Sequence, residues 1–407
     1  MKFFTITARN YLSLALSLGD SISRHHPDAD FIIVVADGLE GIDASLIKHQ
    51  LIPADTIISD DHLYNHLSFK YNITEFCTSI KPFVFDYLYE RTIENEMIFY
   101  FDPDTYLFST VDEITEGHED KNLFLTPHII DCSVEYIHTY PEYKHLWEGI
   151  FNLGFCGIRK KKESKIIIDW WKKRLIDFCY ADYFEGLHTD QKWMDYAPVY
   201  FSEQLCVVKH FGCNVSHWNI DERNITKVGD VYFSNAQPLI FFHFSGFDFN
   251  RTLLTKHVDE SSQTYLDNSD LNFIANYYRN VVRTNGYEKF ISLKYKYNFF
   301  SDGTPISSLQ RRLFRKMKLG QNENPFDINA SVFKVFLSNN LLSSDRFAVE
   351  NYSVRTVNNL DNKIKKVETL LKLTKRVLGM KYYTYLIKLF SRYGRFENHT
   401  FLISDKE

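Results

Sequence analysis

Two carboxylates separated by one residue, Asp102 and Asp104, directly follow the apolar run 97–101. An uninterrupted apolar run of five residues is typical of a buried strand. Two acidic side chains at its carboxyl end suit two chemistries. They can act as nucleophile and general acid, or they can hold a hard divalent cation through their oxygen atoms.

The first chemistry is that of haloacid-dehalogenase-type phosphatases, whose motif has the form DxDxT. Asp102, Asp104 and Thr105 fit this spacing. That fold also requires a later lysine and a further acidic pair after another strand, and no apolar run after residue 104 ends in two acids. About 100 residues of apparent β/α structure also precede the pair, which disfavours this interpretation.

The second chemistry is that of the DxD motif of nucleotide-sugar transferases. There the two carboxylates bind Mn²⁺ or Mg²⁺, and the metal binds the diphosphate of the donor. Breaking the bond between sugar and phosphate leaves negative charge on the diphosphate, which a Lewis acid stabilises. A DxD pair alone does not distinguish this site from a solvated turn.

The elements that must position the pair begin at the N-terminus. Residues 3–8 and 31–37 are continuous apolar strands, and apolar positions recur at helical spacing over 11–26 between them. Two buried strands joined by a helix form a βαβ unit, so we expect an α/β fold with a mostly parallel sheet flanked by helices. Ligands of such sheets bind at the carboxyl ends of the strands, where Asp37 and Asp102 lie.

The rest of the chain continues the alternation. We predict further strands at 55–59, 97–101, 121–128, 151–160 and 237–247, and helices at 46–50, 75–91 and 164–184. The composition changes near residue 255, and from about 331 the chain is helical and strongly basic. We therefore predict a catalytic domain at 1–255, an accessory segment at 256–330 and a basic helical C-terminal region at 331–407.

Four further segments follow the DPD sequence in order: FNLGF at 151–155, TDQKW at 189–193, NVSHWN at 214–219 and HFSGF at 243–247. In their order and content these motifs resemble the retaining family-8 glycosyltransferases, which have the Rossmann-like GT-A fold. The resemblance spans roughly residues 1–255.

The resemblance implies roles for individual residues. Asp102, Asp104 and His243 would be the protein ligands of Mn²⁺ or Mg²⁺. The donor would contact a larger set, which also includes the metal ligand Asp102: Thr7, Ala8, Arg9, Asp37, Lys81, Asn152 and Gly246. Asp190 and Gln191 would lie beside the reacting anomeric carbon.

Several of these residues have ordinary structural alternatives. Asp37 is equally suited to cap a turn, Lys81 to lie in solvent, and Asn152 to occupy a turn. His243 alone would fit an aromatic core strand, and Trp218 of the NVSHWN segment is better explained by packing. A carboxylate such as Asp190 could also act as the base of an inverting enzyme.

The composition bounds the remaining possibilities. The net charge of −5 over 407 residues disfavours a nucleic-acid partner. The six cysteines lack metal-binding spacing and are expected to be free, buried thiols. No secretory h-region or membrane-length apolar run is visible, so we expect a cytoplasmic protein.

The C-terminal region adds a possible membrane contact. Residues 363–395 contain ten lysines or arginines and one acid, Glu368. Apolar positions recur at helical spacing on both sides of Gly379, which indicates two short amphipathic helices. Such helices either bind the inner face of an anionic membrane through 363–396, or pack on the catalytic domain with a solvated charged face.

Taken together, the sequence predicts a metal-dependent glycosyltransferase that uses a nucleotide sugar, with a UDP-sugar favoured. The acceptor would be a bacterial surface glycan or a lipid-linked glycan, and the donor's anomeric configuration would be retained. The alternatives are a nucleotidyltransferase on a related fold, although 5–13 contains no glycine-rich loop, and a non-catalytic binding protein.

Overall fold

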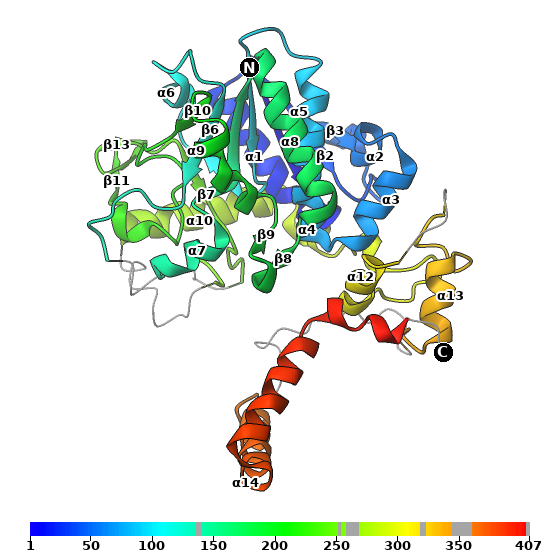
Figure 1. Ribbon diagram of the computed structural model, residues 1–407. Helices are drawn as coiled ribbons and strands as arrows, with labels where there is room; N and C mark the ends of the chain where they lie inside the picture. Colours follow the sequence, from blue (N-terminus) through cyan, green and yellow to red (C-terminus); the bar gives the residue numbers. More distant parts are fainter. Residues whose placement is uncertain (136–139, 251–253, 258–267, 318–322, 344–359, 404–407) are drawn as a thin grey trace. The chain divides into compact units, whose positions relative to one another are not determined.

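The computed structural model describes residues 1–135, 140–250, 254–257, 268–317, 323–343 and 360–403 (Figure 1). The chain forms two compact units, residues 1–60 with 73–295 and residues 61–72 with 296–407. The first unit therefore extends past the predicted boundary at 255, and an internal segment belongs with the second. The portions of our predicted segments at 258–267, 318–322, 344–359 and 404–407 lie outside the described residues.

A seven-stranded sheet forms the centre of the first unit, in the order β10-β6-β7-β4-β1-β2-β3. Its strands are β1 Lys2–Thr7, β2 Asp30–Val35, β3 Gln50–Pro53, β4 Met97–Phe101, β6 Leu123–Pro127, β7 Phe151–Arg159 and β10 Leu205–Val207. All neighbours are parallel except β7, which runs antiparallel to both β4 and β6. The predicted α/β fold with a mostly parallel sheet is confirmed.

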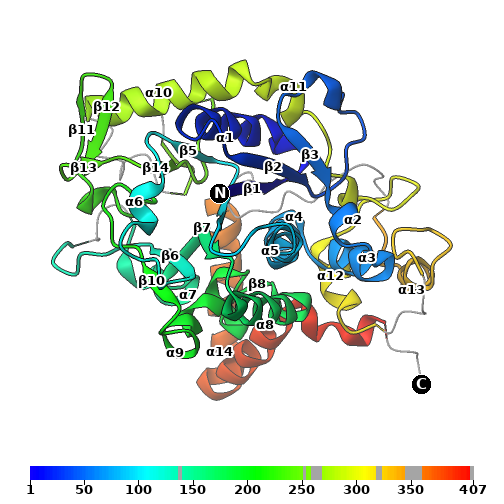
Figure 2. The same ribbon diagram turned by 90° about the horizontal axis from the view of Figure 1, so that it is seen from above.

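Helices cover both faces of this sheet, which is why the central strand β4 is apolar or aromatic at every position. Helices α1, α10 and α11 lie on one side, and α4, α5 and α8 lie on the other (Figure 2). Alternate side chains of β1 point to opposite faces of the sheet. Phe3 stacks on Phe99 within the core beneath α1, whereas Phe4 meets Phe85 of α5 edge to face. The bounds of the helices are α1 Leu12–His25, α2 Ala54–Ile57, α4 Ile73–Ser79, α5 Lys81–Tyr89, α6 Asp112–Thr115, α7 His145–Glu148, α8 Lys162–Phe178, α9 Ala197–Tyr200, α10 Ser269–Thr284 and α11 Tyr287–Ile291.

Three smaller sheets occur in the described part of the first unit. They pair β5 Thr105–Leu107 with β14 Phe241–His243, β8 Ala181–Asp182 with β9 Leu187–His188, and β11 Ile225–Val228 with β12 Val231–Ser234 and β13 Gln237–Pro238. The short 3₁₀ helices of this unit are η1 Arg9–Tyr11, η2 Ala44–Leu46, η3 Glu142–Lys144, η4 Tyr183–Glu185, η5 Gln191–Tyr196 and η6 Ile220–Glu222.

Some sequence predictions were wrong in detail. The segment 55–59, predicted as the third strand, begins within the helical turn α2, and the third strand is instead β3. The segment 46–50, predicted as a helix, contains only the last residue of η2 and the first residue of β3. These segments are too short for periodicity to separate helix from strand. The helix predicted over 75–91 is two helices that divide at Ile80, ahead of Pro82. The strand predicted at 237–247 is likewise divided, into β13 and β14.

Two further predictions need correction. The helix predicted over 164–184 ends at Phe178, and the remaining residues form β8 and the start of η4. The six cysteines are free, as predicted, but Cys132 is exposed and Cys77 is half-buried, so the thiols are not uniformly buried.

The second unit contains α3 Asp61–Lys70, α12 Ser308–Phe314, α13 Ser331–Ser338 and α14 Leu360–Tyr393, with 3₁₀ helices η9 Lys296–Asn298, η11 Phe396–Asn398 and η12 Thr400–Leu402. The buried guanidinium of Arg311 joins its early and late segments. It donates hydrogen bonds to the carbonyl oxygens of Phe69 and Tyr71, at 2.6 and 2.9 Å, and to that of Tyr297.

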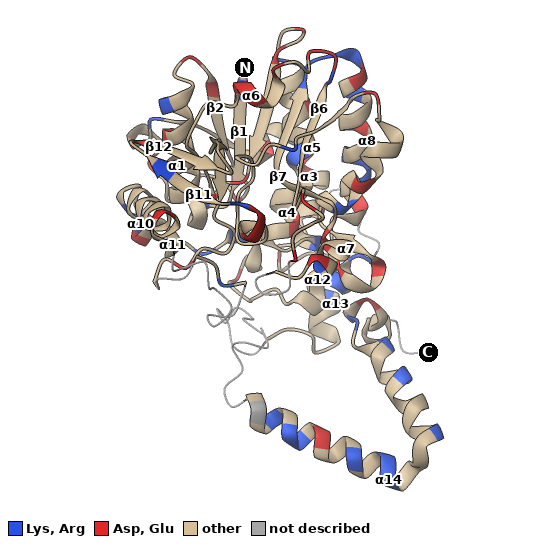
Figure 3. Ribbon diagram, turned by 90° about the vertical axis from the view of Figure 1, so that its left-hand side faces the viewer, with Lys and Arg blue, Asp and Glu red and all other residues tan. Residues whose placement is uncertain are grey.

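Helix α14 is divided at Gly379, whose backbone is non-helical (φ 72°, ψ 168°). The two helical halves predicted from the sequence are thus confirmed. Lysines and arginines follow one another along both halves (Figure 3), and the apolar side chains between them are exposed, including those of Val367, Val377, Tyr382 and Phe390. Within the described part of the chain, no helix is both long and apolar enough to cross a bilayer.

Candidate active site

The DPD segment is held in place by three neighbouring strands. Asp102 follows β4, and its N–H donates to the carbonyl oxygen of Gly154 on β7, at 2.8 Å. The chain then turns, and the Thr105 N–H donates to the Asp102 carbonyl at 3.0 Å. β5 pairs with β14 so that Thr105 lies opposite His243. This register carries the HFSG histidine to the aspartates.

The three predicted metal ligands do lie together. Nε2 of His243 is 3.1 Å from Oδ1 of Asp104 and 3.7 Å from Oδ2 of Asp102. One ligand atom of each residue lies within 4.8 Å of the others. Burial alone would raise the pKa of the Asp104 carboxyl, but the His243 imidazole outweighs burial and lowers that pKa. Two carboxylates and one imidazole suit Mn²⁺ or Mg²⁺.

Tyr100 orients one of these carboxylates. Its hydroxyl donates to Oδ1 of Asp102, which leaves Oδ2 toward His243. Residues i and i+2 of a strand point to the same face, so Tyr100 and Asp102 share a face at the end of β4. Burial, followed by the charge of Asp102, raises the pKa of the Tyr100 phenol well above its usual value, so it stays a donor. Tyr100 is not among the site residues predicted from the motifs.

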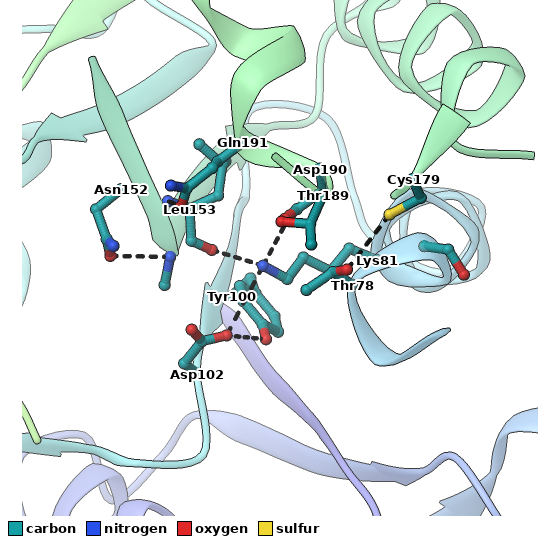
Figure 4. A network of polar contacts seen from close by, with 12 residues as sticks. Thr78, Lys81, Tyr100, Asp102, Asn152, Leu153, Cys179, Thr189, Asp190 and Gln191 are labelled. Atoms are coloured by element: carbon teal, nitrogen blue, oxygen red, sulfur yellow. Dashed lines mark hydrogen bonds and ion pairs between the residues drawn. The ribbon is translucent and has the colours of Figure 1, made fainter. Parts of the chain in front are cut away.

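A buried lysine joins the aspartate pair to the TDQKW segment (Figure 4). Nζ of Lys81 lies 2.8 Å from Oδ2 of Asp190 and 3.7 Å from Oδ1 of Asp102, and it donates to the Leu153 carbonyl at 2.7 Å. It also lies 4.3 Å from the ring centre of Tyr100. The Lys81 side chain is only 2% exposed, so the solvated alternative is wrong.

The pKa values of Lys81 and Asp190 depend on two opposing effects, burial and the attraction between their opposite charges. Burial raises the pKa of the Asp190 carboxyl, and the Lys81 ammonium opposes that rise. Burial would lower the pKa of Lys81, but Asp190 and Asp102 more than compensate and raise it. Lys81 is therefore a fixed positive charge between two carboxylates.

The FNLG segment supplies free backbone groups because β7 is irregular there. Against β6, Asn152 pairs with Thr126 and Cys156 pairs with Leu125, so residues 153–155 have no partner on β6. The Leu153 carbonyl within this irregular stretch accepts from Lys81, whereas the Gly154 carbonyl accepts from the Asp102 N–H one position beyond the regular pairing of Phe155 with Phe101 of β4. A register shift of this kind is often found beside functional sites.

Asp190 and Gln191 are both held by neighbours. The residue before them, Thr189, has φ 47°, a strained conformation for a β-branched residue. Its hydroxyl donates to Oδ1 of Asp190 at 3.2 Å. The Gln191 amide donates to the Glu148 carbonyl at 2.8 Å. Strained backbone of this type is concentrated at functional sites.

These groups line one cleft of about 1170 Å³ in the first unit. Asp102, Asp104, His243, Lys81, Asn152, Asp190 and Gln191 all contribute to its wall. Other lining residues escaped the sequence analysis, including His128, Glu148, His217 and His257. In the sequence these residues are isolated histidines and a glutamate in separate segments, and no common spacing relates them. Trp218 also lines the cleft.

The donor-binding residues predicted at the ends of β1 and β2 lie outside this cleft. Thr7, Ala8, Arg9 and Asp37 are buried and are not part of the cleft wall. Asp37 accepts from the backbone N–H of Arg9 at 2.9 Å and from its Nε at 3.1 Å. The other guanidinium nitrogens donate to the carbonyls of Glu40 and Lys294. The Arg9 side chain is thus fully used in joining the ends of β1 and β2 to the loop after α11.

Gly246 has φ 65° and faces a side chain. A Cβ at this position would lie 2.4 Å from Nε2 of His257, which does line the cleft. Both the left-handed backbone and the close approach of His257 explain the glycine.

Comparison with known proteins gives remote similarities. No family model matches the chain. It is 24% identical over 283 residues to uncharacterized protein YfnF of Bacillus subtilis, and the match covers 69% of this chain and 91% of that one. It is 27% identical over 268 residues to uncharacterized protein YfnD of the same species, covering 62% and 79%.

Several solved glycosyltransferase structures are similar to the chain. The galactosyltransferase LgtC, in complex with donor and acceptor sugar analogues, matches with a TM-score of 0.42 and 15% identity, covering 70% of this chain and 96% of that one. Mouse xyloside xylosyltransferase 1 gives 0.37 and 10%, covering 60% and 96%. GlyE of Streptococcus pneumoniae gives 0.37 and 14%, covering 74% and 66%.

Proposed function

We propose that this chain is a metal-dependent glycosyltransferase that uses a nucleotide-sugar donor. The observation that carries the proposal is the convergence of Asp102, Asp104 and His243 on the wall of a cleft large enough for such a donor. These three residues would hold Mn²⁺ or Mg²⁺. When bound, the metal supplies Lewis-acid stabilisation of the charge that develops on the leaving diphosphate.

The chain's own groups prepare the site for that charge. Lys81 brings a buried ammonium to the same wall, where a cation acts in a low dielectric and needs little reorganisation. Tyr100 fixes the direction of the Asp102 carboxylate through its hydroxyl. Asn152 accepts from the Gly154 N–H at 3.1 Å and thereby holds the backbone beside Asp102.

Asp190 and Gln191 would flank the sugar. Asp190 is paired with Lys81 and Gln191 is tied to the Glu148 carbonyl, so both present fixed groups to the cleft. The Lys81 ammonium lies 2.8 Å from Oδ2 of Asp190 and competes with an acceptor hydroxyl or water for that oxygen, which favours retention over base-assisted inversion. An NMR spectrum of the first-formed product tests this: the donor's anomeric configuration supports retention, and the inverted one makes Asp190 the candidate base.

The reaction class is tested by incubating the protein with Mn²⁺ and a panel of UDP- and GDP-sugars. We expect metal-dependent release of UDP from one UDP-sugar, and loss of that release in the Asp104→Asn variant. Asp112→Asn, a change of an exposed aspartate on α6, is the matched control and should retain it. Binding of nucleotide without any release or transfer would instead make the chain a binding protein.

The acceptor is proposed to be a glycan, in lipid-linked form at the membrane surface. Between residues 363 and 395 ten basic residues stand against Glu368, and the apolar side chains of both halves of α14 are exposed. Basic helices with exposed apolar and aromatic residues bind anionic bilayers, with about 1 kcal/mol for each basic residue near the surface. The partner proposed for α14 is therefore an anionic membrane.

Flotation with liposomes tests this contact. Removal of the C-terminus would also remove Glu397, which pairs with Arg312 of α12, so charge changes are preferable to truncation. We expect the full chain to float with anionic vesicles at low salt, and the variant with Lys365, Lys366, Lys372 and Lys375 changed to Gln to stay behind. Equal recovery of both proteins would contradict the contact.

A further inference from the structure

Apart from the DPD site, a second group of cation-binding side chains lies along the cleft. It consists of His128 after β6 and of His145 and Glu148 on the helical turn α7. One ligand atom of each residue lies within 4.8 Å of the others. None of the sequence motifs includes these residues.

His145 is the most informative member. It is 7% exposed, and neither of its ring nitrogens makes a hydrogen bond with any described residue. Leaving a buried polar group without a partner costs about 1–3 kcal/mol, so such groups normally have one. Nδ1 of His145 lies 3.3 Å from Oε2 of Glu148. That separation matches the roughly 3.3 Å between two ligand atoms that each lie 2.0–2.1 Å from a tetrahedral ion.

His128 is in the form that a metal ligand requires. Nδ1 lies 3.3 Å from the Ile150 carbonyl, to which it can donate, and this leaves the lone pair on Nε2. Histidine ligands commonly donate their second ring nitrogen to a backbone carbonyl in this way. Among the described residues, the Asn152 amide nitrogen alone approaches Nε2, as a hydrogen-bond donor at 3.3 Å.

The surroundings fix these side chains in place. The rings of His128 and His145 stack with centroids 4.5 Å apart, and the Tyr140 hydroxyl donates to Oε1 of Glu148. Trp218 separates this group from the first site. Its ring meets His128 edge to face at 5.6 Å and His243 at 5.1 Å.

We propose that His128, His145 and Glu148 bind a second divalent metal ion, of the Zn²⁺ type. Two imidazoles and one carboxylate are the ligand set that Zn²⁺ favours, whereas the carboxylate-rich first site suits a harder ion. Three protein ligands leave a fourth position for water or a ligand hydroxyl. His128 and Glu148 both line the cleft, so this position faces the same space as the first site. The proposal does not depend on the transferase activity.

The test uses the full chain with Asp102→Asn and Asp104→Asn, which removes the harder site. After treatment with a chelator, Co²⁺ is titrated as a spectroscopic substitute for Zn²⁺, and visible absorption is recorded. We expect one Co²⁺ per chain, displaced by Zn²⁺. Adding His145→Gln should weaken Co²⁺ binding at least tenfold, and so should Glu148→Gln.

The matched control is His118→Gln, a change of an exposed histidine, which should leave Co²⁺ binding unchanged. Circular dichroism establishes which variants fold. If His145→Gln does not fold, Glu148→Gln decides the result. Absence of saturable Co²⁺ binding to the starting variant would overturn the proposal, and so would equal binding when His145 or Glu148 is changed.

Discussion

The imidazole ring of His243 occupies the space above the Cα atom of Gly154. A Cβ at residue 154 would lie 2.3 Å from Cε1 of His243 and 2.6 Å from its Nδ1. The glycine of FNLG and the histidine of HFSG, 89 positions apart in the printed sequence, therefore explain one another. Because real Cβ contacts are never this short, any side chain at 154 must displace the ring that faces Asp104.

Gly154→Ala should therefore disturb the first metal site. We expect at least a tenfold loss of Mn²⁺-dependent nucleotide affinity, measured by calorimetry, with the far-ultraviolet dichroism retained. The control is Gly157→Ala on the same strand, where a Cβ would lie 3.0 Å from Phe99 and touch no ligand. That variant should lose stability but keep its affinity. Equal affinities in the wild type and Gly154→Ala would refute the account of the glycine.

Removal of Tyr100's hydroxyl should weaken metal binding without abolishing it. Groups that orient a metal ligand typically contribute 10–100-fold to affinity. Tyr100→Phe is therefore expected to lower Mn²⁺ affinity by about that factor, as measured by electron paramagnetic resonance of free Mn²⁺. Tyr106→Phe is a matched control because the Tyr106 hydroxyl bonds that of Tyr277, at 3.0 Å, whereas the Tyr100 hydroxyl bonds Asp102. No change in Tyr100→Phe would exclude an orienting role.

The Lys81–Asp190 pair should be strongly coupled in stability. Lys81→Met leaves a buried carboxylate uncompensated, which costs about 3–5 kcal/mol of unfolding free energy. Adding Asp190→Asn should restore much of that loss, giving a large coupling energy in urea unfolding. For comparison, Lys2→Met breaks a pair with the exposed Asp30 and should cost under about 1 kcal/mol. Additive effects of the two buried changes would show that the pair is not coupled.

Stability should also depend on pH through His128. The unfolded histidine binds a proton below pH 6.5, whereas in the folded metal-free protein burial holds its pKa at about 3. Its contribution is thus complete above pH 6.5 and is lost as the pH falls toward 3, at about 1.4 kcal/mol per pH unit. In chelator, His128→Asn should reduce the slope of unfolding free energy against pH by that amount. The exposed His118→Asn should not change the slope.

Local pattern predicted the sheet well but not its short elements. The strands at 3–8, 31–37 and 97–101 are continuous apolar runs, and burial on both faces of a parallel sheet requires that pattern. β3 and α2 are only four residues each, so their type depends on neighbours that the local sequence does not specify. The break at Ile80 lies just before Pro82, which occupies the first turn of α5, where a proline is tolerated.

The site was predictable where a motif contained the ligand, and not where only the fold brings residues together. Asp102, Asp104 and His243 meet because β5 pairs with β14, and Lys81 is buried because two carboxylates compensate its charge. His128, His145 and Glu148 come from separate segments with no common spacing. The donor role predicted for Arg9 and Asp37 stays a prediction, since their polar groups bind each other outside the cleft.

The central claim is that Asp102, Asp104 and His243 together bind the metal that holds a nucleoside diphosphate. Calorimetric titration of UDP in the presence of Mn²⁺ tests it most directly, using the wild type and the variants Asp102→Asn, Asp104→Asn and His243→Ala. The account predicts Mn²⁺-dependent UDP binding to the wild type, a loss of at least tenfold in each variant, and unchanged dichroism. Unchanged Mn²⁺-dependent affinity for UDP in all three folded variants would contradict it.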